Sequence, residues 1–99
     1  MHEQIQQRYN ELPYKSYPFV STHPNHLATI ATLFGMLPKA IDACRVLELG
    51  CAAGGNLIPM AQQLPGSEFV GIDLSSRQID EGQSMLASLK LPNIRLGFK

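Results

Sequence analysis

Net charge, cysteine and long apolar runs are all scarce in this sequence. Eight basic and eight acidic side chains cancel over 99 residues. Nucleic acids and anionic membranes are bound through an excess of basic residues, so we expect neither as a partner. No window approaches the roughly 18 apolar residues of a membrane span, and the polar residues 1–20 do not resemble a secretory signal. We therefore expect a cytoplasmic protein.

The two cysteines predict neither a metal site nor a disulfide. Cys44 and Cys51 have a spacing that matches no zinc pattern. The strand expected between them would hold their side chains too far apart for a disulfide. Reduced thiols are expected, with no metal site. A chain of this length, with no internal repeat, forms one domain at most.

Predicted strands and helices alternate in the second half of the sequence. The strands are expected at 45–49, 68–73 and 93–98, and the helices at 56–64 and 75–89. Ser75 and Gln78 form a capping box at the start of the second helix. This order implies parallel pairing with right-handed crossovers. The fold class is therefore α/β, with a three-stranded parallel sheet and flanking helices.

Residues 1–44 form a lead-in of helical and irregular segments. Its best helix is expected to begin at Pro24, with Thr22 or His23 as the cap, and to stop at Gly35. Apolar side chains recur on one face of this helix at Leu27, Ile30, Ala31 and Phe34.

A run of small residues, "GCAAGG" at 50–55, follows the first strand and opens the next helix. In parallel sheets, ligands collect beyond the carboxyl ends of the strands. Small residues there let a ligand approach the backbone, and the start of the helix favours an anionic group by about 0.3–1 kcal/mol. The alternative is a tight turn that binds nothing.

An acid ends the next strand: Asp73 follows "FVGI". A carboxylate at this place can accept hydrogen bonds from both hydroxyls of a ribose. The competing role is to cap the following helix, although Ser75 already offers that cap. Together, the glycine turn and the acid indicate a ligand that contains adenosine.

Two types of adenosine ligand fit the pattern to different degrees. Counted from Gly50, the run is a dinucleotide fingerprint in which Ala52 replaces the second glycine. That reading, a nicotinamide-binding module, is disfavoured by the acid Glu48 inside the strand. Counted two residues earlier, "ELGCAAG" is an acid followed by G-x-A-x-G. "VLELGCAAGGN" with "FVGIDLSSRQIDEGQ" resembles the first two motifs of class I S-adenosylmethionine-dependent methyltransferases, over residues 45–83.

This resemblance implies a partial Rossmann-like methyltransferase fold, with residues 45–99 as its cofactor-binding half-domain. The cofactor-binding residues that it implies are Glu48, Gly50, Ala52, Gly54, Asp73 and Leu74. The three loop residues would let the methionine portion of S-adenosylmethionine lie against the backbone, and the glutamate would organise the loop. The aspartate would take the ribose hydroxyls. The leucine would pack on the adenine, unless it only packs in the core. Ala52 departs from the glycine that many members have.

The sulfonium of that cofactor supports direct methyl transfer, which requires no metal and no covalent intermediate. His23 and His26 are candidates for a base or for metal ligands, but capping and surface roles are the simpler alternatives. Tyr14 and Tyr17 are candidates for a lid over the cofactor, with ordinary packing as the alternative.

Members of this family have a seven-stranded sheet, and the sequence supplies strands for only one half of it. We expect a truncated catalytic domain that transfers methyl groups only in the complete protein, to an acceptor that these residues do not identify. Strand 45–49 would then have an unpaired apolar edge, which predicts self-association through that edge. The alternative function is a non-catalytic binding or self-assembly module that retains the half-fold.

Overall fold

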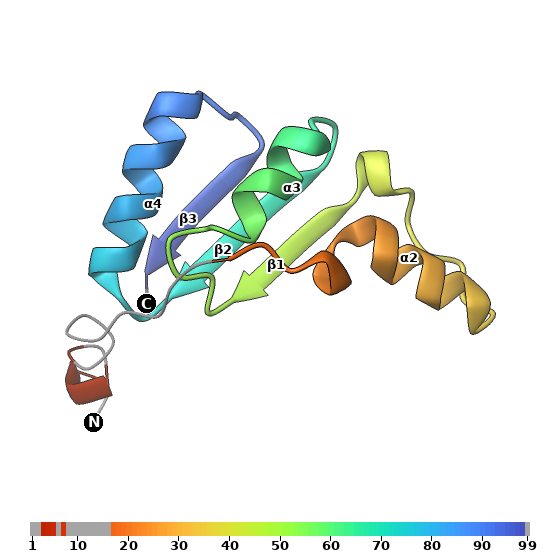
Figure 1. The fold of residues 1–99 in the computed structure, drawn as a ribbon, viewed down its shortest axis with the longest axis horizontal. Coiled ribbons are helices and arrows are strands. Elements are labelled where there is room, and N and C mark those ends of the chain that lie inside the picture. Colours follow the sequence, from red (N-terminus) through yellow and green to blue (C-terminus); the bar gives the residue numbers. More distant parts are fainter. Residues whose placement is uncertain (1–2, 6, 8–16, 99) are drawn as a thin grey trace.

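The computed structural model describes residues 3–5, 7 and 17–98 and contains a sheet of three parallel strands (Figure 1). The strands are β1 (Arg45–Leu49), β2 (Glu68–Asp73) and β3 (Ile94–Phe98). Their order in the sheet is β1-β2-β3. Leu49 pairs with Ile72, and Asp73 pairs with Phe98, so the carboxyl ends of all three strands lie side by side at one end of the sheet. The predicted α/β fold is confirmed.

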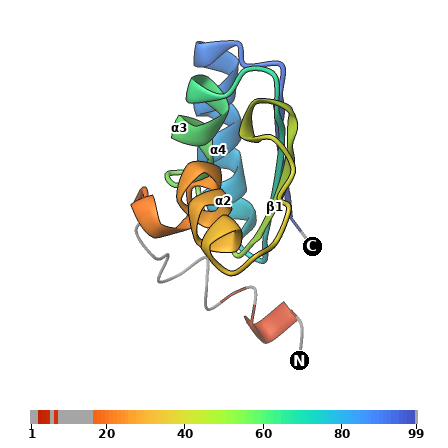
Figure 2. The ribbon, with the colours of Figure 1, turned by 90° about the vertical axis from the view of Figure 1, so that its right-hand side faces the viewer.

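The helices within residues 24–89 lie on one side of this sheet, and those at 57–63 and 76–89 pack against its strands (Figure 2). They are α2 (Pro24–Leu33), α3 (Leu57–Gln63) and α4 (Ser76–Leu89), with short 3₁₀ helices η1 (Val20–Thr22) and η2 (Ile41–Ala43). α3 connects β1 to β2, and α4 connects β2 to β3, as parallel pairing requires. In the described part of the chain, no helix has both the length and the apolar character needed to cross a membrane.

Local sequence signals explain where two of these helices begin. The Ser75 hydroxyl caps α4 by accepting a hydrogen bond from the backbone N–H of Gln78, at 3.2 Å. The cap of α2 is His23 rather than Thr22, because its Nδ1 accepts the backbone N–H of Asn25 at 3.1 Å. α2 therefore begins at the predicted Pro24, and α4 begins one residue after the predicted Ser75, which is its cap.

The core lies between the sheet and the helices. Phe69 of β2 is 1% exposed and Leu57 of α3 is fully buried. Burial of such a side chain contributes about 1.5–3 kcal/mol to the free energy of folding. The remaining buried apolar side chains are Cys51, Ile58, Met60, Ala61, Ile79, Ile94 and Leu96. They fix α3 and α4 on the sheet and so hold the loops that follow the carboxyl ends of the strands.

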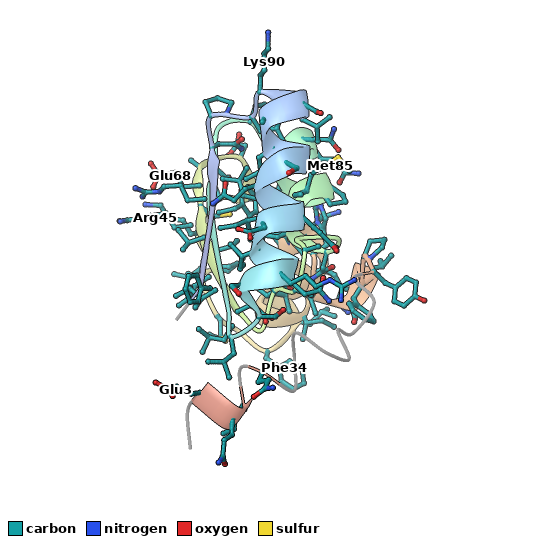
Figure 3. All side chains as sticks on the ribbon, turned by 90° about the vertical axis from the view of Figure 1, so that its left-hand side faces the viewer. Glu3, Phe34, Arg45, Glu68, Met85 and Lys90 are labelled. Carbon is teal, nitrogen blue, oxygen red and sulfur yellow. The ribbon has the colours of Figure 1, made fainter. Side chains whose placement is uncertain are left out.

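The opposite face of the sheet has no helix over it among the described residues. Arg45 and Glu68 point away from the helices on this side (Figure 3). Alternate residues of β1 are exposed, and Leu47 and Leu49 are 61% and 74% exposed. β1 is also the edge strand beside β2. No described strand pairs with the outer edge of β1, so the unpaired edge expected for residues 45–49 is present, with Leu47 and Leu49 exposed on the face beside it.

Candidate functional site

The loop after β1 and the acid at the end of β2 lie together. The backbone N–H groups of Gly50 and Cys51 both donate to the Ile72 carbonyl, at 2.7 and 3.1 Å. The backbone N–H of the next residue, Ala52, donates to Asp73 Oδ2 at 2.8 Å. Parallel register brings the two strand ends side by side, as the sequence pattern implies. The glycine turn and the carboxylate thus form one site.

The backbone of this loop is left-handed at three positions. Gly50 and Gly54 have φ values of +76° and +83°, which glycine adopts without steric cost. Ala52 has a φ of +52°. Its hydrogen bond to Asp73 offsets part of the cost of that conformation, which a side chain with a Cβ rarely adopts. A Cβ on Gly50 would meet no atom within 4 Å, so the backbone there borders open space.

Asp73 connects the loop to α4 as well. Its Oδ1 accepts the Ser75 backbone N–H at 2.8 Å while Oδ2 holds Ala52. The competing structural role is therefore present in the structure. Each carboxylate oxygen has a second lone pair, so both oxygens can still accept a ligand hydroxyl. Binding of a ribose by Asp73 stays a prediction.

Glu48 points to the helix side of the sheet and reaches the start of α3. Its Oε2 accepts the side-chain amide of Asn56, with a separation of 2.6 Å between the oxygen and Nδ2. Its Oε1 is buried and has no hydrogen-bond partner among the described residues. A buried acceptor without a partner is rare, since it loses its contact with water and gains nothing in return. This oxygen fits a donor supplied by a ligand or by a bridging water.

Sequence reasoning missed Asn56. The side chain is 6% exposed and bonds to Glu48 and to two residues of the lead-in, Phe19 and Thr22. An asparagine at the start of a helix normally indicates a cap. Asn56 stands at the N-cap of α3 but makes no capping hydrogen bond with its side chain. The only local sequence signal therefore suggested a different role.

Cys51 lies inside the loop and is 3% exposed. Burial raises the pKa of its thiol from the ordinary 9.0 to about 12, and the negative charges of Asp73 and Glu48 add to the rise. The thiol stays protonated at neutral pH and packs as a small apolar group. It lies against β2, where a Cβ on Gly71 would come within 2.8 Å of the sulfur.

The other residues singled out by the sequence are Leu74, two histidines and two tyrosines. Leu74 follows Asp73 directly and is half-buried, so its packing on adenine stays a prediction. His23 is the α2 cap, with Nε2 bonded to Gln63 Oε1 at 2.9 Å, and His26 is exposed. Among the described residues, no three potential metal ligands gather. Tyr14 lies outside the described residues, and Tyr17 is 53% exposed.

Comparisons with known proteins agree with the geometry of this site. A family described as a methyltransferase domain matches residues 41–97. An uncharacterised protein of Rickettsia prowazekii (strain Madrid E), RP789, is 54% identical over 86 residues, which are 87% of this chain and 16% of that protein. The structure of PKMT2 from Rickettsia typhi in complex with AdoHcy has 37% identity and a TM-score of 0.82, over 88% of this chain and 17% of PKMT2.

More distant structures share the fold alone. Geranyl diphosphate C-methyltransferase from Streptomyces coelicolor A3(2) is 21% identical, with a TM-score of 0.60 over 96% of this chain and 45% of that one. The chain spans about a sixth of the length of RP789 and of PKMT2. The family match covers more than half of the chain, on the strands and loop that form the site. The chain belongs to the methyltransferase domain family, as the sequence resemblance predicts.

Proposed function

We propose that this chain is the S-adenosylmethionine-binding portion of a methyltransferase. The main support is the hydrogen bond from the backbone N–H of Ala52 to Asp73. This bond places the backbone of the small-residue loop beside the carboxylate, at the carboxyl ends of β1 and β2. The AdoHcy bound to the related PKMT2 supports this ligand class. AdoHcy is the product that S-adenosylmethionine leaves after transfer. Methyl transfer itself is the activity that we propose for the complete protein.

Each residue of the proposed site contributes through a different group. Gly50 presents backbone that borders open space, and Ala52 adds a single methyl group to that surface. Gly54 is buried, and a Cβ there would lie 3.0 Å from Ile58 and 3.2 Å from Leu96, so its contribution is the left-handed turn of the loop. Oε1 of Glu48, which has no partner among the described residues, accepts a hydrogen bond from the amino group of the methionine portion, directly or through water. Asp73 accepts the ribose hydroxyls with its remaining lone pairs.

Leu74 completes the proposed site by packing against the adenine. The cofactor supplies a methyl group on a sulfonium, which is electrophilic without a metal. The chain's own task is therefore to orient the ligand and exclude water. We assign no base to these residues. The greater length of the relatives supports the proposal that the acceptor binds outside them.

A second candidate function follows from the exposed edge of the sheet. Among the described residues, only β2 pairs with β1, and Leu47 and Leu49 of β1 are largely exposed. Such edges pair readily with other strands. We propose self-association through residues 45–49, which a non-catalytic assembly module would use in the same way. We also propose a cytoplasmic location and a division into the lead-in 1–44 and the cofactor-binding half-domain 45–99.

Calorimetric titration separates these candidate functions. We expect the chain to bind AdoHcy, and expect NAD to bind far more weakly or not at all. Asp73→Ala should weaken AdoHcy binding at least tenfold, because a hydrogen bond to a charged group is worth about 1.5–3 kcal/mol. Binding of NAD alone would overturn the proposal. A folded chain that binds neither ligand but forms oligomers would favour the assembly module.

A further inference from the structure

We propose that Asn56 is a positioning residue that couples the cofactor site to the lead-in segment 19–22. The inference rests on the proposed function, because the ligand in question is the one assigned there. It adds a role for a residue outside the predicted site. It also adds a connection, made by hydrogen bonds, between two parts of the chain that lie more than 30 residues apart in sequence.

The hydrogen-bond partners of Asn56 fix the orientation of its amide. The backbone N–H of Phe19 can only donate, so the group facing it at 2.6 Å must be the carbonyl oxygen Oδ1. Nδ2 therefore faces Glu48 Oε2, which lies 2.6 Å away, and Thr22 Oγ1, which lies 2.9 Å away. Because Asn56 is only 6% exposed, water cannot replace these partners of its side chain. Both N–H donors of Nδ2 and one of the two acceptor positions of Oδ1 are used within the protein.

On the side of the site, Asn56 determines which oxygen of Glu48 remains available. Its amide occupies Oε2, and Oε1 is left buried without a partner among the described residues. A donor group of the cofactor would satisfy Oε1 and remove the cost of that unpaired acceptor. If Asn56 were absent, the carboxylate would be free to rotate. The ligand would then have to order it on binding.

On the side of the lead-in, Asn56 holds a closed set of hydrogen bonds. The Thr22 hydroxyl accepts from Asn56 and donates to the Phe19 carbonyl at 2.9 Å. Phe19 in turn donates its N–H to Asn56. Segment 19–22 is thus attached to the start of α3 as a unit. A second attachment, from His23 Nε2 to Gln63 Oε1, is exposed to solvent and does not involve Glu48.

The two sides share one side chain, so their free energies are linked. A ligand that orders Glu48 strengthens the hold of Asn56 on segment 19–22. Attachment of the segment must raise the affinity for the ligand by the same factor. A purely structural asparagine would stabilise the fold without this link. Asn93 is such a residue, since its Nδ2 donates to the carbonyls of Ala61, Leu64 and Ser67, next to none of the proposed site residues.

The experiment measures AdoHcy affinity by calorimetry and amide hydrogen exchange at Phe19, on the same 99-residue chain. In the wild type, AdoHcy should slow exchange at Phe19 severalfold. In Asn56→Ala, affinity should fall roughly tenfold, the effect of losing a hydrogen bond to a charged group, and exchange should no longer respond to AdoHcy. Asn93→Ala is the matched control: it should lower the Tm and leave the affinity and the exchange response unchanged.

Thr22→Val tests the same link without disturbing a buried residue, because Thr22 is exposed. It should weaken AdoHcy binding about threefold and reduce the protection of Phe19. This variant decides the matter if Asn56→Ala does not fold. The inference is wrong if the wild type binds AdoHcy without a change at Phe19, or if the folded variants bind as tightly as the wild type. In those cases the proposed function stands; a wild type that binds no AdoHcy contradicts both.

Discussion

A single carboxylate, that of Asp73, holds the loop and the start of α4 by accepting one backbone N–H from each. In Asp73→Asn, one of these N–H groups would face the amide NH₂ and lose its acceptor. We expect the free energy of unfolding to fall by about 1–3 kcal/mol and AdoHcy affinity to fall at least tenfold. Denaturant unfolding and calorimetry measure the two effects. Asp80→Asn, on the exposed side of α4, is the control that should change neither.

Cys51 and Cys44 provide an internal comparison of thiol reactivity. Because burial raises the pKa of Cys51 to about 12, almost none of its thiolate, the reactive form, exists at pH 8. Cys44 is only half-buried. We expect iodoacetamide at pH 8 to alkylate Cys51 at least ten times more slowly than Cys44, as mass spectrometry of the peptides would record. Equal rates would show that the loop opens readily.

The raised pKa of the Cys51 thiol also predicts that the free energy of unfolding depends on pH in the alkaline range. Its folded-state pKa is higher than the ordinary 9.0, so the folded state binds this proton more tightly than the unfolded state does. The stability contributed by the protonated thiol is therefore complete below about pH 9 and is lost as pH rises toward 12. In Cys51→Ala the loss of stability over this range should be smaller. An identical pH dependence in both proteins would contradict the assignment.

The sequence could predict the residues of the site that belong to local patterns. Gly50 and Asp73 stand at the ends of strands that the alternation of elements already implies, and parallel register then brings them together. Asn56 could not be predicted, because its partners Phe19 and Thr22 lie far away in the sequence. Contacts of this kind depend on how the lead-in packs against α3. The spacing of apolar residues along the sequence does not predict that packing.

At the scale of elements, α4 and the loop touch through a glycine. A Cβ on Gly82 would lie 2.9 Å from the Ala53 carbonyl oxygen and 2.5 Å from a methyl group of Leu96. Gly→Ala in an unobstructed helix stabilises a protein by about 0.4–1 kcal/mol. Here the loop backbone obstructs the methyl group, so we expect Gly82→Ala to lower the Tm instead. Ser84→Ala, at an exposed position of the same helix, should leave it nearly unchanged.

Element boundaries followed from the sequence to within one residue in the second half of the chain. The strand 68–73 was predicted with its observed bounds, because a charged residue starts it and Asp73 ends it. The helix predicted at 56–64 is α3, Leu57–Gln63, because Asn56 is its N-cap and Leu64, its C-cap, leaves helical geometry. The strand predicted at 93–98 begins at Ile94, since the Asn93 side chain is bonded to the carbonyls of Ala61 in α3 and of Leu64 and Ser67 after it.

At the scale of the molecule, helices lie over one face of the sheet (Figure 2), and no described strand pairs with the outer edge of β1. Self-association through this edge predicts a concentration-dependent mass in light scattering at roughly tens of micromolar, where the half-fold has an unpaired strand to offer. Leu47→Lys should shift the chain toward the monomer. Leu37→Lys, at a fully exposed apolar position outside β1, is the control. A strictly monomeric wild type would refute self-association.

The central claim is that AdoHcy binds where the loop after β1 meets the end of β2. Amide chemical shifts of the ¹⁵N-labelled chain, recorded during titration with AdoHcy, locate the ligand directly. We predict the largest changes at Gly50, Ala52, Gly54 and Leu74, with Asn93 at the opposite end of the sheet unaffected. Changes confined to α2 or to the amino ends of the strands, with the loop unperturbed, would contradict the account.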